Sequence, residues 1–419
     1  MQKFKLTQRE KAWILYDVGN SAFTMMVSTL IPIFFNSLAT GAGIEKDTYL
    51  AYWGYAVSIA TILTAVIGPV FGTVADRKDT KKRVFLVSLV IGAAACALMG
   101  FAWSWLLFLA VFVIAKVSYS SSLVFYDAML PEVTTEDRMD NVSSQGFAWG
   151  YIGSCIPFII CLVLYLLASI GHLFPENTAL IAGFIITAVW WVVMTIPLLK
   201  TYHQTQYVEA EGNPFVQSFQ RLWETFKDIR HQKHIFLFLL AFFFFIDGVY
   251  TIIDMATAYG QSVGLEATGL LLALLVTQFV AFPCSIIFGR LAGKYDTGIL
   301  IKVCIIAYTC ITIFAIFLAH QWQFWVLAVA VGMFQGGIQS LSRSYFGKII
   351  PAEKSGEYFG LYDICGKGAA FMGTTLIAVV TQLTGHQNIG VGSIVLIFIA
   401  GFIVFTVTDR AGKGRQAAK

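Results

Sequence analysis

Residues 72–80 read Gly-Thr-Val-Ala-Asp-Arg-Lys-Asp-Thr, and residues 289–297 read Gly-Arg-Leu-Ala-Gly-Lys-Tyr-Asp-Thr. Glycine, alanine, a basic residue, aspartate and threonine recur in the two stretches at one offset of 217 positions. A second match sets residues 126–131, Tyr-Asp-Ala-Met-Leu-Pro, beside residues 345–351, which also begin with tyrosine and end with proline. The chain therefore consists of two halves that resemble each other.

Long apolar blocks flank both repeats. The 419-residue chain is 58% hydrophobic and only 12% charged, and a helix needs about 20 mainly apolar residues to cross the hydrocarbon core of a bilayer. Twelve blocks are near or above this length: about 12–38, 49–75, 84–103, 105–127, 143–170, 178–199, 235–259, 267–291, 299–319, 322–347, 359–383 and 388–408. The sequence predicts an all-α integral membrane protein with twelve transmembrane helices in two pseudo-symmetric six-helix bundles.

The longest polar stretch, residues 200–233, divides the twelve blocks into six and six. We therefore expect an N-terminal bundle over residues 1–199, a middle loop over 200–233 and a C-terminal bundle over 234–419. Duplicated halves around a middle loop are typical of transporters, whose substrate sites lie between the halves near the bilayer midplane.

Basic residues are distributed unequally between the two sides of the predicted membrane. Of the 28 Lys and Arg residues, 24 fall on the side of the termini and the middle loop, and the outer loops hold only Lys46. Cytoplasmic loops retain positive charge, so both termini and the 200–233 loop are predicted to be cytoplasmic. The charges lie in short loops, which argues against a nucleic-acid partner. Short loops and a compact length favour a prokaryotic inner or plasma membrane.

Away from the ends of the predicted spans, seven charged residues fall inside them: Asp17, Lys116, Asp247, Asp254, Arg343, Asp363 and Lys367. A charge at the centre of a membrane helix costs about 2.5–3.5 kcal/mol on insertion scales, so we expect these groups to face a cavity or one another. Asp363 and Lys367 are four residues apart and are expected to pair with each other. Asp17 matches Asp247 weakly between the halves.

The loop after the second span resembles a known signature. Residues 72–83 are similar to the loop motif of the major facilitator superfamily, Gly-x-Leu-Ala-Asp-Arg-x-Gly-Arg-Lys, with Val74, Asp79 and Thr80 as departures from it. Residues 335–344, Gln-Gly-Gly-Ile-Gln-Ser-Leu-Ser-Arg-Ser, and the Tyr-Asp-x-x-Asn-Ser-Ala run at 16–22 resemble one branch. That branch is named for a fungal vacuolar amino-acid effluxer linked to autophagy and has many bacterial members.

The resemblance implies secondary transport. In this superfamily the first, fourth, seventh and tenth helices line the central cavity, which implies that five of the seven charges line it. The predicted set for substrate binding or coupling is Asp17, Asn20, Lys116, Asp247, Asp254, Gln335, Gln339 and Arg343. The resemblance also implies a conformational loop containing Gly72, Asp76 and Arg77, in which Asp76 faces the end of a neighbouring helix and helps to hold one conformer.

Cations and anions occur together among these residues. Such a set suits a zwitterion, and it equally suits a proton-coupled carrier of a neutral solute in which an aspartate protonates and frees its basic partner. We expect a secondary active transporter of a small polar solute, with an amino acid as the first expectation and protons as coupling ion. An exporter of a drug, a sugar or a lipid-like amphiphile is the alternative.

Other classes fit the sequence less well. No His, Cys or Ser arrangement has the spacing of an enzyme site, no cysteine group has metal-ligand spacing, and no nucleotide-binding loop occurs. We therefore expect no catalytic activity, cofactor or metal, and a monomer that works in the lipid bilayer with its small-molecule substrate. A non-transporting receptor is the alternative from another class, although it would not need charges on cavity helices of both halves.

The predicted topology is testable by labelling. A single cysteine placed at position 210, in a variant without native cysteines, is expected to resist a membrane-impermeant maleimide applied outside intact cells. The same cysteine is expected to react in inverted vesicles. Clear labelling from outside would contradict the orientation derived from the basic residues.

Overall fold

The structure is a computed structural model that describes residues 4–28, 30–44, 46–209, 232–262, 264–265 and 267–417, with Glu224 and Lys227. The first group of helices comprises α1 (Gln8–Ser28), α2 (Leu30–Gly41), α3 (Lys46–Ala75), α4 (Lys81–Met99), α5 (Trp105–Ala128), α6 (Leu130–Val133), α7 (Glu136–Ser169) and α8 (Glu176–Thr201). The second group comprises α10 (Lys233–Ser262), α11 (Ala267–Ala292), α12 (Thr297–Ala315), α13 (Gln321–Ile349), the 3-10 helix η1 (Ala352–Lys354), α14 (Ser355–Thr384), α15 (Gln387–Gly392) and α16 (Ile394–Ala417).

The predicted membrane architecture is confirmed. Within the described residues, eleven helices are long and apolar enough to cross a membrane. The first predicted block corresponds to α1 and α2, which are separated only by residue 29, outside the described residues. Most of the predicted middle loop, including 210–223, also lies outside them, so the division into 1–199, 200–233 and 234–419 remains a prediction.

Local signals set several helix ends. The Ser104 side chain accepts a hydrogen bond from the Leu107 amide at the start of α5, and Asp296 does the same for Ile299 at the start of α12. Such caps satisfy N–H groups that have no partner within the helix. Gly385 ends α14 with a φ of 71°, a left-handed conformation that glycine adopts without steric cost.

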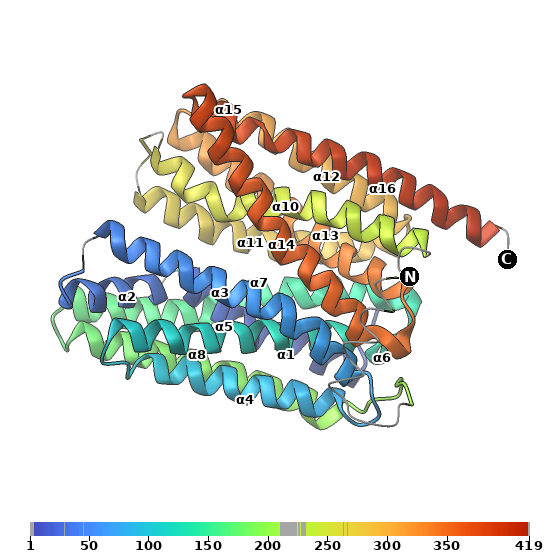
Figure 1. Cartoon of the computed structure of the whole chain (residues 1–419), viewed down its shortest axis with the longest axis horizontal. Coiled ribbons are helices and arrows are strands. Elements are labelled where there is room, and N and C mark those ends of the chain that lie inside the picture. Colours follow the sequence, from blue (N-terminus) through green and yellow to red (C-terminus); the bar gives the residue numbers. More distant parts are fainter. Residues whose placement is uncertain are drawn as a thin grey trace.

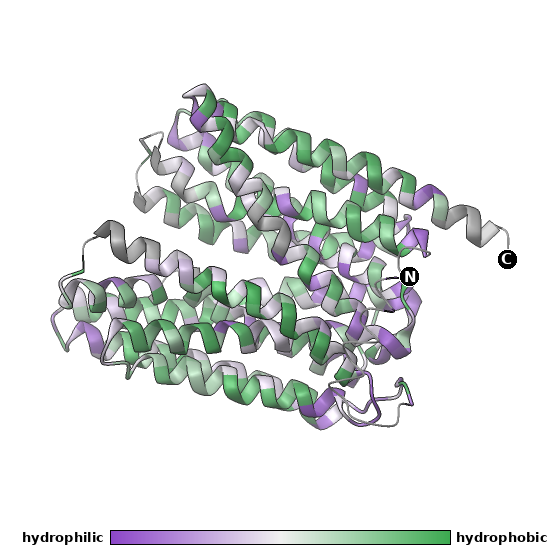
Figure 2. Cartoon of the chain, in the orientation of Figure 1, coloured by the Kyte–Doolittle hydropathy of each residue, from purple (hydrophilic) through white to green (hydrophobic). Residues whose placement is uncertain are grey.

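The two groups of helices lie side by side (Figure 1). They separate towards one end of the molecule and meet at the other, where both termini lie (Figure 1). We call this second end the basic end, because it carries Arg77, Lys81, Arg138, Lys200 and Lys348. Figure 2 shows apolar residues along most of the helix lengths and many hydrophilic residues towards the basic end.

Each half has its own apolar core. Aromatic side chains such as Trp13, Phe108 and Trp191 are fully buried in the first half, and Phe238, Phe346 and Phe398 are fully buried in the second. The halves contact each other mainly through α3 and α5 with α14 and through α7 with α11 and α13. Each half is therefore packed mainly around side chains of its own.

The repeated glycines lie at these junctions. A Cβ atom at Gly72 of α3 would collide with the carbonyl oxygen of Gly356 in α14. A Cβ atom at Gly289, its counterpart in α11, would meet the side chain of Ser144 in α7 at 2.8 Å. Small residues let helix backbones approach closely in membranes, so the repeat positions both inter-half contacts in the same way.

The Gly72→Val variant is expected to separate α3 from α14, because the new side chain meets backbone rather than a flexible group. We expect a longer distance between spin labels placed on the two halves at the basic end, measured by double electron–electron resonance. Gly54→Val on the same helix is the matched control, since Gly54 has nothing within 4 Å of its Cβ position. Equal distances in both variants would contradict this contact.

Candidate functional site

The Asp76 carboxylate holds the first turn of α14. Its two oxygens accept hydrogen bonds from the backbone amides of Gly356 at 2.7 Å and Glu357 at 2.8 Å. Asp76 is 1% exposed and lies 3.7 Å from the Lys81 ammonium. Burial raises the pKa of Asp76 to about 7, and Lys81 and the two amides oppose that rise. A residue between α3 and α4 thus satisfies two N–H groups that the start of α14 leaves without helical partners.

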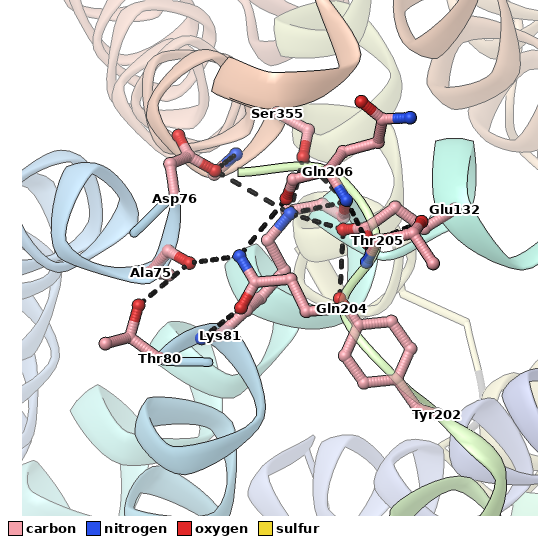
Figure 3. Close-up of polar contacts among 12 residues, drawn as sticks. Ala75, Asp76, Thr80, Lys81, Glu132, Tyr202, Gln204, Thr205, Gln206 and Ser355 are labelled. Carbon is pink, nitrogen blue, oxygen red and sulfur yellow. Dashed lines mark hydrogen bonds and ion pairs between the residues drawn. The ribbon is translucent and has the colours of Figure 1, made fainter. Parts of the chain in front are cut away.

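Lys81 joins the same two halves from the start of α4 (Figure 3). Its side chain is fully buried, and its ammonium donates to the Glu132 carboxylate at 2.7 Å and to the Ser355 hydroxyl at 2.8 Å. A third, longer bond reaches the Ala128 carbonyl at 3.5 Å. All three donors of the ammonium are therefore used, and one of them crosses to the second half.

Glu132 is the centre of this network (Figure 3). Its Oε1 atom accepts from Lys81 and from the Tyr202 hydroxyl at 2.9 Å. Its Oε2 atom accepts from the Thr205 amide at 2.6 Å and the Gln206 amide at 3.1 Å. The segment that follows α8 therefore fixes the carboxylate that holds Lys81.

The same segment also covers the loop between α3 and α4. The Gln204 side chain donates to the carbonyls of Ala75 and Arg77 and accepts from the Lys81 amide. The Val208 amide donates to the Asp76 carbonyl at 2.7 Å. The first residues of the predicted 200–233 loop are thus fastened to the loop between α3 and α4.

A second inter-half contact centres on Arg343 of α13. Its guanidinium donates to Asp127 of α5 at 3.0 Å and to Asp17 of α1 at 3.4 Å. It also donates to the hydroxyl and the carbonyl of Ser143 in α7. The Tyr126 hydroxyl donates to the same Asp17 oxygen at 2.7 Å. One buried arginine of the second half is thereby held by three helices of the first.

Aromatic rings enclose this arginine. The guanidinium carbon lies 4.3 Å from the centre of the Phe147 ring and 4.6 Å from that of Trp13. Trp13 is in turn stacked on Tyr126 and donates to its carbonyl. Arginine is weakly hydrated and stacks on aromatic faces, which suits it to a contact from which water is excluded.

Asp140 of α7 forms a third inter-half contact. It accepts from the Lys348 ammonium at 2.5 Å, the Ser344 hydroxyl at 2.6 Å and the Thr297 hydroxyl at 2.8 Å, all from the second half. Thr297 belongs to the repeat that begins at Gly289. That repeat has Gly293 at the place of Asp76, and the acid that contacts it comes from the opposite half instead.

Four charges of both signs lie further from the basic end. Lys116 of α5 interacts electrostatically with Asp254 of α10 and with Asp363 and Lys367 of α14. Asp363 and Lys367 pair at 2.6 Å, as the sequence indicates. Asp254 is exposed and the other three are partly exposed. These charges come from spanning helices of both halves, and we call them the mixed-charge site.

The other residues singled out in the sequence are placed separately. Asn20 lies beside Asp17, with 3.4 Å between its amide nitrogen and the carboxylate. Gln335 is buried and Gln339 half-buried on α13. Asp247 is fully buried on α10. Of the eight residues predicted for binding or coupling, only Lys116 and Asp254 belong to the mixed-charge site.

Sequence reasoning did not identify Asp127, Lys81, Glu132 or Asp140 as site residues. Asp127 is the last residue of the predicted span 105–127 and lies in the repeated motif at 126–131. Its position in that repeat could have indicated a functional role. The other three lie at the loop ends of helices, where charge is ordinary. Within the described residues, no three His, Cys, Asp or Glu side chains come together in a group that could hold a metal ion.

Two bundles of spanning helices that meet through ion pairs at one end define a membrane transporter of the major facilitator class. The chain belongs to the Atg22-like family, since the family described as "Vacuole effluxer Atg22 like" matches residues 7–419. It is 43% identical to the MFS-type transporter YxiO of Bacillus subtilis (strain 168), over 96% of this chain and 94% of that protein.

More distant relatives are fungal. The chain is 21% identical to autophagy-related protein 22 of Kluyveromyces lactis, over 98% of this chain and 94% of that protein. Autophagy-related protein 22-2 of Aspergillus clavatus is 29% identical over 58% of this chain, and the match spans 44% of the fungal protein.

Solved structures share the fold. The transporter FucP in its outward conformation has a TM-score of 0.70 at 14% identity, covering 96% of this chain and 97% of that one. A bacterial homologue of the iron transporter ferroportin in its outward-facing state has a TM-score of 0.67 at 14% identity, covering 96% and 98%. At such low identity the likeness shows the fold alone.

Glu132→Gln is expected to destabilise the protein, because it leaves the buried Lys81 ammonium without its closest ionic partner. Removing one member of a buried pair costs about 3–5 kcal/mol. Asp76 lies 3.7 Å from the same ammonium and still offsets part of its charge, so we expect the loss in unfolding free energy to lie at the lower end of this range. Thermal and denaturant unfolding of the purified protein measure this.

Glu136→Gln, an exposed acid four residues further on, is the control and is expected to leave stability unchanged. The double variant Lys81→Met with Glu132→Gln is expected to recover at least half of the loss, because no buried charge remains unpaired. Losses that simply add in the double variant would show that the two residues do not interact.

Proposed function

We propose that this transporter moves a small zwitterionic solute, with amino acids as the first class, by alternating access of its two halves. The observation that carries the proposal is the mixed-charge site. Lys116 comes from the first half, and Asp254, Asp363 and Lys367 come from the second, where Asp363 and Lys367 pair at 2.6 Å. An ammonium and a carboxylate on one small molecule can each find an opposite charge in this set, and binding them would join the two halves.

The contacts at the basic end support the mechanism. Asp76, Lys81, Arg343 and Asp140 all bridge the halves at that end. We infer that the basic end is cytoplasmic, because cytoplasmic loops retain positive charge. In this proposal the structure is closed to the cytoplasm, and substrate reaches the mixed-charge site from outside. Opening requires these polar contacts to be exchanged for contacts with water.

The coupling ion and the membrane in which the protein works are proposed as well. We propose that protons drive the transport, because acids lie within spanning helices of both halves at Asp17, Asp127, Asp247, Asp254 and Asp363. The fold is shared with FucP, which is described as a fucose:proton symporter. We also propose that the protein works as a monomer in a bacterial plasma membrane, a setting that its similarity to the Bacillus subtilis relative supports.

Purified protein in proteoliposomes tests the function directly. We expect accumulation of one or more labelled amino acids when the outside is acidic, and weaker or no transport of neutral sugars and cationic drugs. Accumulation of a sugar or a drug instead would assign the chain to that substrate class. If no amino acid, sugar or drug is transported, the result would favour a non-transporting receptor.

Lys116→Gln is expected to weaken zwitterion binding. A hydrogen bond to a charged group contributes about 1.5–3 kcal/mol, so the Kd should rise roughly 10-fold or more, since about 1.4 kcal/mol is a factor of ten. The melting temperature should change little, because the substrate rather than a fixed ion pair is the partner of this ammonium. Lys294→Gln, at an exposed loop lysine, is the matched control.

A lowered melting temperature with an unchanged Kd would show that Lys116 has a structural role. Isothermal titration and thermal unfolding on the same preparation of Lys116→Gln distinguish the two results.

A further inference from the structure

Asp247 lies in an unusual environment for a carboxylate. It is fully buried on α10, 14 residues after Lys233, which places it about 21 Å along the helix at roughly 1.5 Å per residue. One carboxylate oxygen accepts from the Gly373 amide of α14 at 3.0 Å, with the Thr251 hydroxyl at 3.5 Å. Within the described residues, the other oxygen is buried and has no hydrogen-bond partner.

No neighbouring cation offsets a negative charge at Asp247. The helices packed against α10 are α11, α12, α13, α14 and α16, and their cations among the described side chains are engaged elsewhere or exposed. Arg343 binds Asp17 and Asp127, Lys348 binds Asp140, Lys302 binds Asp409, Lys367 binds Asp363, and Arg290 and Arg410 are exposed. Asp254, two turns along α10, is itself an acid.

The uncharged titratable groups on these helices do not supply positive charge either. They are Cys284 of α11, Cys304, Tyr308 and Cys310 of α12, Tyr345 of α13, Tyr358, Tyr362 and Cys365 of α14, with Tyr250 and Tyr259 of α10 itself. His234 of α10 lies 13 residues before Asp247 and hydrogen-bonds the Tyr345 hydroxyl. A buried unpaired carboxylate is costly in such surroundings, whereas its protonated form needs only one further hydrogen-bond acceptor. The neutral acid is therefore the form that this packing favours.

The contact between α10 and α14 depends on Gly373. A side chain there would collide with the Thr251 hydroxyl and approach Asp247. The same α14 helix begins at the basic end, where Asp76 binds its first amides and Lys81 binds Ser355. One continuous helix thus links the Asp247 carboxyl to the contacts that close the basic end.

We propose that Asp247 is the proton-binding site of the transport cycle and carries its proton in the conformation described here. The proposal deepens the proton-driven transport proposed above and rests on it. When the carboxyl loses its proton to water, the charge that remains requires hydration, and α14 must move away from α10 to admit water. That movement pulls the start of α14 from Asp76 and Lys81, so proton release and opening of the basic end occur together.

The sign of the pH effect follows from this step. The closed conformation binds the proton more tightly than the open one, so its population is greatest at low pH and falls as the pH rises. Spin labels at Arg83→Cys and Tyr295→Cys, exposed positions on opposite halves at the basic end, report the closed fraction by double electron–electron resonance. Between pH 5.5 and 8.5 we expect the closed-to-open ratio to fall at least tenfold.

Asp247→Asn keeps the shape of the neutral acid and still accepts from the Gly373 amide. This variant is expected to remain closed at both pH values. Asp137→Asn, at an exposed acid in the first turn of α7, is the matched control and should respond like the unmodified protein. Asp76 is the competing explanation, because its pKa of about 7 also lies in this range.

Asp76→Asn is therefore measured beside Asp247→Asn. A pH response that survives in Asp76→Asn and disappears in Asp247→Asn supports the proposal. A response that persists in Asp247→Asn, or is absent from the unmodified protein, overturns it. Should Asp247→Asn fail to fold, Asp247→Glu decides: a displaced midpoint of the pH response supports the proposal, and an unchanged midpoint overturns it.

The label measurement uses no substrate. A protein that fails to transport amino acids but shows this pH response would refute the substrate class and leave the proton site standing. Amino-acid accumulation with no pH response of the spin labels would support the substrate class and refute the proton site.

Discussion

The contact on which the closed structure depends is the capture of the α14 N-terminus by Asp76. The first amides of any helix have no partner within it, and they carry the positive end of the helix dipole. Placing a carboxylate there from the opposite half satisfies two donors at once. Gly72 permits it, because only a residue without a side chain lets α3 come this close to Gly356. Lys81 then holds the adjacent Ser355.

Much of the fold could be predicted from the sequence because membrane spans are set by length and hydrophobicity. The block at 105–127 and the helix Trp105–Ala128 differ by one residue. The pairing of distant helices could not be predicted in this way. Asp17 and Arg343 were recognisable as costly intramembrane charges, but nothing in their spacing indicates that Arg343 pairs with both Asp17 and Asp127. Glu132 was not recognisable at all, because its partners at 202–206 become neighbours only in the fold.

The two halves repeat in sequence yet differ in how their acids are satisfied. Asp17 faces a guanidinium from the other half and a tyrosine hydroxyl. Asp247, its weak match, has only an amide and a distant hydroxyl. Duplication supplies two similar frameworks, and in this protein Asp17 is part of an ion pair while Asp247 has no cationic partner among the described residues. The two matched acids therefore have different electrostatic surroundings.

Joining the two halves at the basic end through polar contacts also suits a protein that must open and close repeatedly. An apolar contact at the basic end would resist opening, since exposing it to water costs free energy in proportion to its area. The ion pairs of Lys81, Arg343 and Lys348 lose attraction when they separate, but each charge regains hydration, and the two terms nearly cancel. The net cost of opening is then small enough for a single event, such as the loss of one proton or the binding of one solute, to shift the balance between the two conformations.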